Sequence, residues 1–113
     1  MPVKVGKLEI IGALLIVALF CGDLITTHII LSGGGAELNP FTRPLWEAGI
    51  LSVLLRETPL YAVLILGTVI ISDRIRRISK ENVRLSQARY FVWAAVLSMF
   101  AFPPIHNLCV ILL

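Results

Sequence analysis

A few charged and polar side chains interrupt the long apolar stretches of this chain, and these residues are the ones that could do chemistry. Asp23 lies in the first apolar stretch, and Arg56 and Glu57 lie side by side in the second. His106 and Asn107 lie in the third. Carboxylates and histidines in apolar surroundings form ion sites, proton relays and general acids or bases. The residue types therefore allow ligand or ion binding, proton or ion transfer, or acid–base catalysis.

None of the common catalytic or metal-binding motifs occurs in the sequence. It has no glycine-rich phosphate loop, no HExxH, no GxSxG and no cysteine pair at metal-ligand spacing. The two histidines show no spacing that supports zinc, so we expect no metal and no cofactor. Cys21 and Cys109 should differ in depth by about 10 Å, too far for a disulfide, and we expect both to be apolar filler.

The elements that carry these residues are predicted to be transmembrane helices. Of the 113 residues 58% are hydrophobic and 15% charged, and the mean hydropathy is +0.91. The apolar residues lie in continuous runs of about 20, which match the thickness of the hydrocarbon core of a bilayer. Continuous rather than alternating runs exclude barrel strands. We therefore expect an all-α, polytopic membrane protein in which residues 1–113 form one transmembrane domain.

Three spans are expected, at about residues 8–31, 49–72 and 90–113. The first follows Lys4 and Lys7, as the apolar part of a signal peptide would follow its basic start. It is too long for a signal peptide, however, and no A-x-A-like cleavage site follows. We interpret it as a retained transmembrane helix.

Glycine and proline divide these segments further. Three consecutive glycines at 33–35 should end the first helix. Asn39 and Pro40 have the residue types of a helix N-cap and first turn, which predicts a short interfacial helix that continues to about Trp46. We also expect Pro103 and Pro104 to break or kink the third span.

A break is predicted in the second span at Thr58 and Pro59. Proline disfavours helical geometry in the residue before it and lacks an N–H to donate. The uninterrupted part, residues 59–72, would be only about 21 Å long, too short to span alone. We therefore expect a short outer piece from about residue 46 to 56 and a longer inner piece.

Lysines and arginines set the expected orientation. Lys4 and Lys7 precede the first span, whereas the connection between the first and second spans has only Arg43. Residues 73–89, between the second and third spans, are strongly basic and are predicted to form an amphipathic helix on the membrane surface. The positive-inside rule then places the N-terminus in the cytoplasm and the C-terminus outside the cell membrane.

The basic connection has an expected partner in the lipid. Its side chains would contact anionic head groups at the cytoplasmic face. The net charge of +3 and the pI near 9.2 are explained by this topology, so we expect no nucleic-acid partner. The residues expected to contact lipid head groups are Arg74, Arg76, Arg77, Lys80 and Arg84.

The topology brings the intramembrane polar residues to similar depths. Asp23 should lie about 12 Å below the outer face, and Arg56, Glu57, His106 and Asn107 about 10 Å below it. Charges in hydrocarbon are costly, so they normally face each other or a water-filled cavity. We expect Asp23 to pair with Arg56, in a polar pocket in the outer half of the bilayer.

The first helix should direct one face toward this pocket. Gly12, Ile16, Leu19, Asp23 and Thr27 share that face at helical spacing, together with Thr26. Simpler interpretations stay open: an Asp–Arg pair that only sets helix register, threonines bonded to their own helix backbone, a hydrogen-bonded His106, and a basic connection that only determines topology.

The chain resembles a family of small prokaryotic integral membrane proteins of unknown function. The resemblance covers about residues 20–60 and rests on an Asp-x-x-x-Thr near the end of the first span, then a glycine, then Glu-x-Asn-Pro. Asp23, Thr27, Glu37 and Asn39 match this pattern together with Pro40, and Arg56 stands where the family often has lysine. The resemblance implies that these positions matter, and it implies no particular reaction.

Three functions follow as hypotheses. The first is a membrane protein with a polar pocket for a small ligand, an ion or a partner helix, acting as a homo-oligomer or as an accessory subunit of a larger complex. The second is a transporter or channel component with an Asp23–Arg56 relay. The third is an intramembrane enzyme that acts on lipid, with Asp23, Glu37 or Glu57 as acid or base and His106 assisting.

Overall fold

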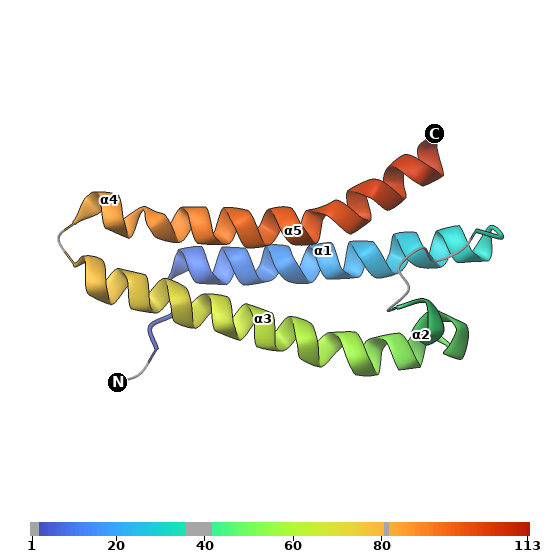
Figure 1. Cartoon of the computed structure of the whole chain (residues 1–113), viewed down its shortest axis with the longest axis horizontal. Helices are drawn as coiled ribbons and strands as arrows, with labels where there is room; N and C mark the ends of the chain where they lie inside the picture. The colour runs from blue at the N-terminus through green and yellow to red at the C-terminus, as the bar shows by residue number, and fades with distance from the viewer. Residues whose placement is uncertain (1–2, 36–41, 81) are drawn as a thin grey trace.

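Three long helices lie side by side along the molecule, which measures 55 × 30 × 21 Å (Figure 1). The structure, a computed structural model, describes residues 3–35, 42–80 and 82–113. In chain order its helices are α1 (Lys7–Ser32), α2 (Arg43–Ala48), α3 (Ile50–Ser79), α4 (Val83–Ser86) and α5 (Ala88–Leu112). The described residues contain no strand. The prediction of an all-α membrane protein is confirmed, since three helices are long and apolar enough to cross a bilayer.

The first helix begins and ends where local chemistry dictates. The backbone N–H of Gly6 donates to the Glu9 carboxylate at 3.0 Å, which satisfies one free donor ahead of the first turn. The helix ends at Ser32, immediately before the three glycines. The predicted start of the interfacial helix at Asn39 and Pro40 lies outside the described residues. Within them, the short helix α2 begins at Arg43.

The break between α2 and α3 lies at Gly49 and not at Thr58 and Pro59. Gly49 has φ 114°, a conformation that favours glycine, and it separates the two helices. The expected break at Pro59 is wrong, because α3 is helical through this residue. A proline removes one backbone hydrogen bond and clashes locally, and a long helix held by packing on both sides of it tolerates this loss.

The basic connection also differs from the expectation. Residues 73–89 were predicted to form one surface helix, but α3 continues to Ser79 and α4 is a separate turn capped by Asn82, whose side chain accepts from the Leu85 N–H at 3.0 Å. With 30 residues, α3 is about 45 Å long, longer than the hydrocarbon core. Its basic end therefore extends beyond the apolar part of the bundle.

The third long helix, α5, stays helical through the two prolines at which a break or kink was expected. Pro103 and Pro104 lie inside α5. The C-terminal part of α5 bends away from α1 (Figure 1). Tandem proline is an established cause of such a bend, since two backbone donors are absent from consecutive residues. Of the two expected outcomes at Pro103 and Pro104, a break or a kink, the helix thus shows the bend and no break.

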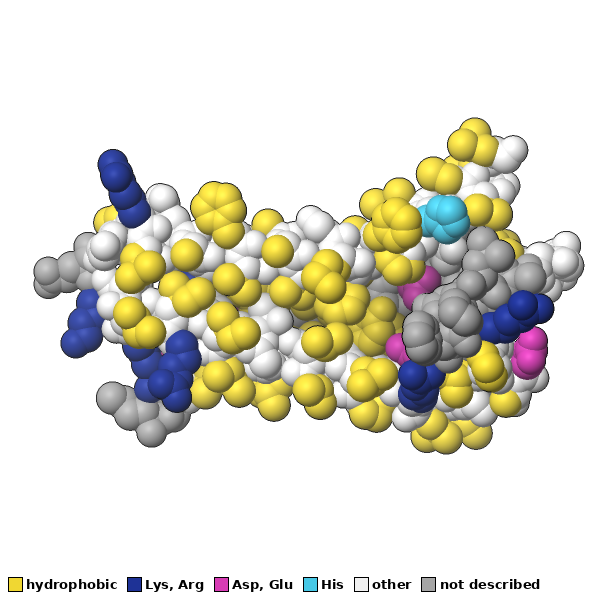
Figure 2. All heavy atoms as spheres, in the orientation of Figure 1, with side chains coloured by type: hydrophobic (Ala, Val, Ile, Leu, Met, Phe, Trp, Pro, Cys, Tyr) yellow, Lys and Arg dark blue, Asp and Glu magenta, His cyan; other side chains and the backbone are white. Residues whose placement is uncertain are grey.

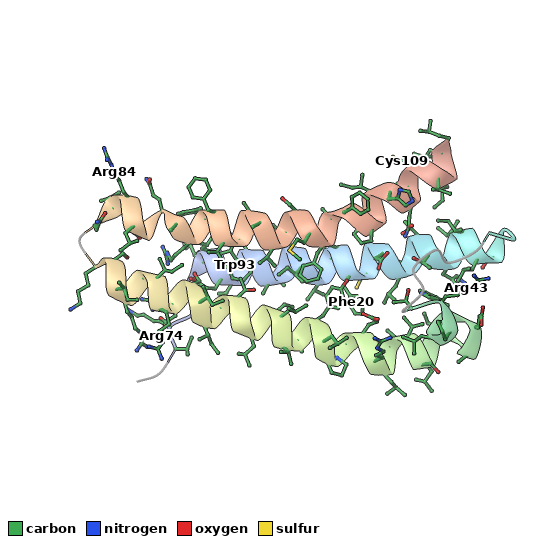
Figure 3. The ribbon with its side chains drawn as sticks, in the orientation of Figure 1. Phe20, Arg43, Arg74, Arg84, Trp93 and Cys109 are labelled. Atoms are coloured by element: carbon green, nitrogen blue, oxygen red, sulfur yellow. The ribbon has the colours of Figure 1, made fainter. Side chains whose placement is uncertain are left out.

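The core lies where the three helices meet. Ile16 of α1, Val69 of α3 and Trp93 of α5 are each at most 8% exposed and form one apolar cluster. A Cβ on Gly12 would lie 2.3 Å from the Trp93 ring, so the glycine is what lets the indole pack against α1. Figure 3 shows Phe20 and Trp93 pointing between the helices.

The face drawn in Figure 2 shows mainly apolar side chains along the length of the bundle. Most of the Lys and Arg side chains on this face lie at the end that carries α4, and others lie at the opposite end near α2. This distribution suits lipid on the long sides and head groups at the ends. The start of α1 and the end of α3 lie at the end that carries α4, and α2 and the C-terminus lie at the opposite end (Figure 1). With three spans, the chain starts at one end of the bundle and finishes at the other.

Candidate functional site

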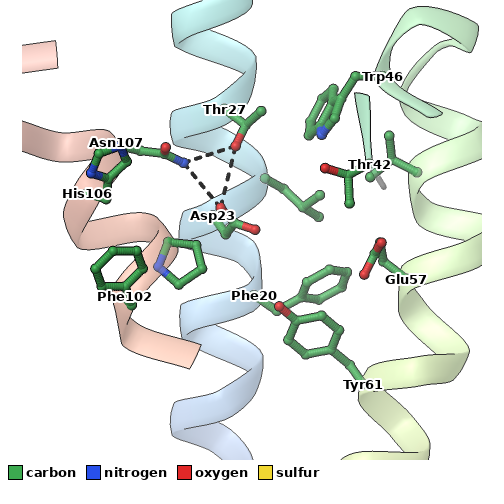
Figure 4. Close-up of a pocket in the computed structure, with 13 residues that line it drawn as sticks. Phe20, Asp23, Thr27, Thr42, Trp46, Glu57, Tyr61, Phe102, His106 and Asn107 are labelled. Atoms are coloured by element: carbon green, nitrogen blue, oxygen red, sulfur yellow. Dashed lines mark hydrogen bonds between the residues drawn. The ribbon is translucent and has the colours of Figure 1, made fainter. Parts of the chain in front are cut away.

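A pocket of about 440 Å³ lies between the long helices near the end that carries α2 (Figure 4). Four helices contribute to it. The lining residues are Phe20, Asp23, Leu24 and Thr27 from α1, Thr42 and Trp46 at α2, Val53, Glu57 and Tyr61 from α3, and Phe102, Pro103, His106 and Asn107 from α5. The pocket thus combines two carboxylates with several aromatic rings.

The predicted inward face of α1 is confirmed and reaches this pocket. Gly12, Ile16, Thr26 and Thr27 are buried in the bundle. Thr26 donates to the carbonyl of Gly22 at 2.7 Å, the local helix bond expected of an intramembrane threonine. Asp23 is half-buried on the same face, where it lines the pocket.

Asp23 belongs to a hydrogen-bond network with α5. The amide nitrogen of Asn107 lies 3.2 Å from Asp23 Oδ1 and 3.0 Å from the hydroxyl oxygens of both Thr26 and Thr27 (Figure 4). An amide carries two hydrogens, so these three acceptors share them. The Thr27 hydroxyl in turn donates to Asp23 Oδ1 at 3.5 Å. The network joins α1 to α5 one turn after Pro103 and holds the Asp23 carboxylate in place.

The second carboxylate comes from α3. Glu57 lines the pocket and is half-buried, whereas its neighbour Arg56 is exposed and does not line the pocket. Adjacent residues on a helix point about 100° apart, so only one of the two faces the cavity. The contacts described for Asp23 are with Thr27 and Asn107, and its pairing with Arg56 stays a prediction.

Aromatic rings form the inner wall of the pocket. Phe20 and Tyr61 stack with ring centroids 4.2 Å apart, and Tyr61 packs against Phe100 at 4.9 Å. These contacts tie α1, α3 and α5 together, and Phe20 and Tyr61 lie next to Asp23 in the pocket (Figure 4). Sequence reasoning missed these rings. Helical spacing could have found them, because Phe20 precedes Asp23 by three residues and Tyr61 follows Glu57 by four.

His106 lines the pocket from α5 but remains exposed. Its ring stacks on Phe102 with centroids 5.8 Å apart. No group of three or more His, Cys, Asp or Glu side chains able to hold a metal ion occurs in the described part of the chain. The remaining predicted site residues, Glu37 and Asn39, lie outside the described residues.

A second polar cluster, which sequence reasoning missed, lies at the opposite end of the bundle. The carboxylate of Glu9 accepts a hydrogen bond from Ser72 Oγ at 2.6 Å and pairs with Arg89 Nη1 at 3.4 Å. Side chains from all three long helices therefore meet here, and Glu9, at their centre, is only 2% exposed. The signal was present in the sequence, because Glu9 continues the Gly12–Thr27 face by one turn toward the N-terminus.

Asp73 is a further buried carboxylate at this end. It pairs with Arg76 and, through Oδ2 at 2.8 Å, with Arg77, and it accepts from the backbone N–H of Lys4 at 3.3 Å. Two of the arginines expected to contact lipid therefore also have a partner within the protein. Arg74, Lys80 and Arg84 are exposed, and Figure 3 shows Arg74 and Arg84 extending from this end.

Fold, apolar surface and intramembrane polar clusters together define a small polytopic α-helical membrane protein with a pocket near one end. None of the known protein families, curated proteins or solved structures with which it was compared matches this chain. The candidate site must accordingly be interpreted from its own chemistry.

Proposed function

We propose that this small integral membrane protein binds a small organic ligand in the pocket between α1, α2, α3 and α5. The observation that carries the proposal is that two carboxylates from different helices, Asp23 and Glu57, line one cavity with Phe20, Tyr61 and Trp46. A volume near 440 Å³ lies within the range of about 300–1,000 Å³ that small-molecule sites occupy. Aromatic and apolar side chains together with placed polar groups are the usual composition of such a site, and this lining combines both.

A small organic ligand suits this pocket better than a partner helix or a bare ion. The Asn107 network holds Asp23 before any ligand arrives, and the Phe20–Tyr61 stack gives a rigid apolar wall. Rigid, preformed surroundings reduce the entropy that binding costs. A partner helix needs an extended groove, whereas this pocket is confined to one short segment of the bundle, about two turns of α1 from Phe20 to Thr27.

The described lining comes from a single chain, so the proposed binding needs no second copy. A homo-oligomer or a larger membrane complex remains our expectation for a different reason. Three helices leave most of their apolar surface facing outward, and neighbouring copies or a partner protein would cover part of it. In the accessory-subunit form of the proposal, the ligand pocket would regulate that partner.

Trp46 fluorescence tests the binding proposal. The protein in lipid nanodiscs is titrated with three probes of similar size, phenyltrimethylammonium, tert-butylbenzene and benzenesulfonate. We expect a saturable change in emission with at least one probe and loss of this change in Trp46→Phe. Leu24→Phe, which fills the pocket, should abolish binding. Leu14 lies on the same helix but outside the pocket and is 64% exposed, so Leu14→Phe should leave binding unchanged. No saturable response to any probe would refute the proposal.

A second candidate function, transport of the ligand, is favoured by the polar clusters at opposite ends of one bundle. The pocket lies at one end, and Glu9, Ser72 and Arg89 join the three long helices at the other. A carrier must hold one end closed while the other admits the ligand. The probe that binds should then enter proteoliposomes faster with the wild-type chain than with Leu24→Phe. Equal rates would leave binding alone as the function.

A further inference from the structure

The charge of the pocket defines the class of its ligand, an inference that rests on the binding function proposed above. We infer that the pocket takes an organic cation, an ammonium group with apolar or aryl substituents, whose charge lies between Asp23 and Glu57 and whose substituents contact Phe20, Tyr61 and Trp46.

The first argument is electrostatic. Both acidic side chains face one cavity, and the described residues that line it include no lysine and no arginine; the one histidine among them, His106, is exposed. Negative charges that share an apolar site repel each other, and a cation between them removes this repulsion. An anionic ligand would add to it. The signs of the lining residues therefore select for positive charge.

The two carboxylates are not equivalent. Asp23 already accepts from Asn107 and Thr27, so its orientation is fixed by donors from the protein. Glu57 has no hydrogen-bond or ion-pair partner among the residues that the structure describes, and its carboxylate points into the pocket (Figure 4). A half-buried acceptor without a protein donor is the group to which an ammonium ligand would bind directly.

The aromatic wall distinguishes an organic cation from a metal ion. Phe20 and Tyr61 stack at 4.2 Å, and Trp46 and Phe102 line the cavity beside them. Ring faces attract cations whose hydration is weak, and Trp and Tyr are the strongest of them. A hard metal ion binds several oxygen ligands, carboxylates foremost, and the described ranges hold no group of three or more acidic, His or Cys side chains placed to bind one. A pocket that combines aromatic rings with two carboxylates therefore suits a substituted ammonium ion better than a metal ion.

The test compares isosteres that differ in charge. Phenyltrimethylammonium and tert-butylbenzene have the same shape, and benzenesulfonate carries the opposite charge. In nanodiscs, we expect the cation to bind wild-type protein at least about tenfold more tightly than either other probe. Glu57→Gln should weaken cation binding about tenfold and leave tert-butylbenzene unaffected. Glu47→Gln, an exposed carboxylate on α2 outside the pocket, is the matched control and should change neither.

Each outcome has a defined meaning. Equal or tighter binding of the neutral or anionic probe overturns the cation inference and leaves the binding pocket intact. The same holds if Glu57→Gln binds the cation as wild type does while its thermal unfolding midpoint is unchanged. If no probe binds, the pocket and the cation inference both fail. Tight cation binding that weakens in Glu57→Gln and not in Glu47→Gln supports both.

Discussion

The carboxylate of Glu9 on α1 accepts a hydrogen bond from the hydroxyl of Ser72 on α3 at 2.6 Å, with both side chains almost completely buried. Arg89 of α5 completes this contact at 3.4 Å. The bundle is therefore joined by polar side chains at the end opposite the pocket, while apolar packing around Trp93 holds its middle. Loss of the Glu9 contacts or of the Trp93 packing should therefore weaken the association of all three helices and not the stability of one helix alone.

The Glu9 contact predicts a stability effect. Glu9→Gln removes the negative charge and leaves Arg89 without its partner, so we expect a loss of about 1–3 kcal/mol in the free energy of unfolding. Glu47→Gln, at an exposed i,i+4 pair, should cost less than about 0.5 kcal/mol. Unfolding in detergent measures both. Glu9→Gln with Arg89→Gln should recover part of the loss, and strictly additive effects would argue against the pairing.

Packing at Gly12 predicts a steric effect. Gly12→Ala would place a methyl group 2.3 Å from the Trp93 ring, so we expect a loss of about 1–3 kcal/mol. Gly67→Ala is the control, because nothing lies within 4 Å of its added Cβ and alanine favours the helix. Thermal unfolding should separate the two variants in opposite directions. Trp93→Phe should restore part of the stability lost in Gly12→Ala, and no restoration would contradict the packing argument.

The Asn107 network predicts a graded series. Asn107→Ala leaves three oxygens without their shared donor and should destabilise the protein by about 1–3 kcal/mol. Asn107→Asp places a second carboxylate against Asp23 and should cost more at neutral pH than the alanine variant. Unfolding in detergent gives the order. If the aspartate variant is the more stable of the two, the Asp23 contact does not form.

The pairing of Asp23 with Arg56 predicts a double-mutant effect. Each single change, Asp23→Asn or Arg56→Gln, should destabilise the fold, and the double variant should recover part of the loss because a lone charge in the membrane is worse than none. Thermal unfolding of the three variants tests this. Additive losses would mean that the residues act separately, with Asn107 as the principal partner of Asp23.

The orientation in the membrane predicts a labelling pattern. In a chain with Cys21 and Cys109 replaced by alanine, single cysteines are placed at the exposed positions Ser32 and Arg84. A membrane-impermeant maleimide added to intact cells should label position 32 and not position 84, because basic connections stay in the cytoplasm. Labelling at 84 from outside would reverse the topology.

By itself, the sequence determined what depends on composition and on local periodicity. Continuous apolar runs require helices in lipid because every backbone group must be paired within its own segment. The buried face of α1, from Gly12 to Thr27, followed from helical spacing alone. The glycines at 33–35 likewise ended α1 where a residue without a side chain makes helix formation expensive.

Tertiary structure decided what depends on contacts between residues far apart in the chain. Pro59 carries a strong local signal for a break, yet α3 passes through it, because packing along a long helix outweighs the loss of one backbone bond. Sequence analysis assigned no role to Glu9 or Asp73, because only the packing of the helices makes these carboxylates buried partners of Ser72, Arg89 and the nearby arginines. The predicted topology and the positions along the spans placed Asp23 and Glu57 at similar membrane depths. The rotation of α3 about its axis then directs Glu57, and not Arg56, into the pocket. That rotation is set by side-chain packing across helices, which no single segment of sequence encodes.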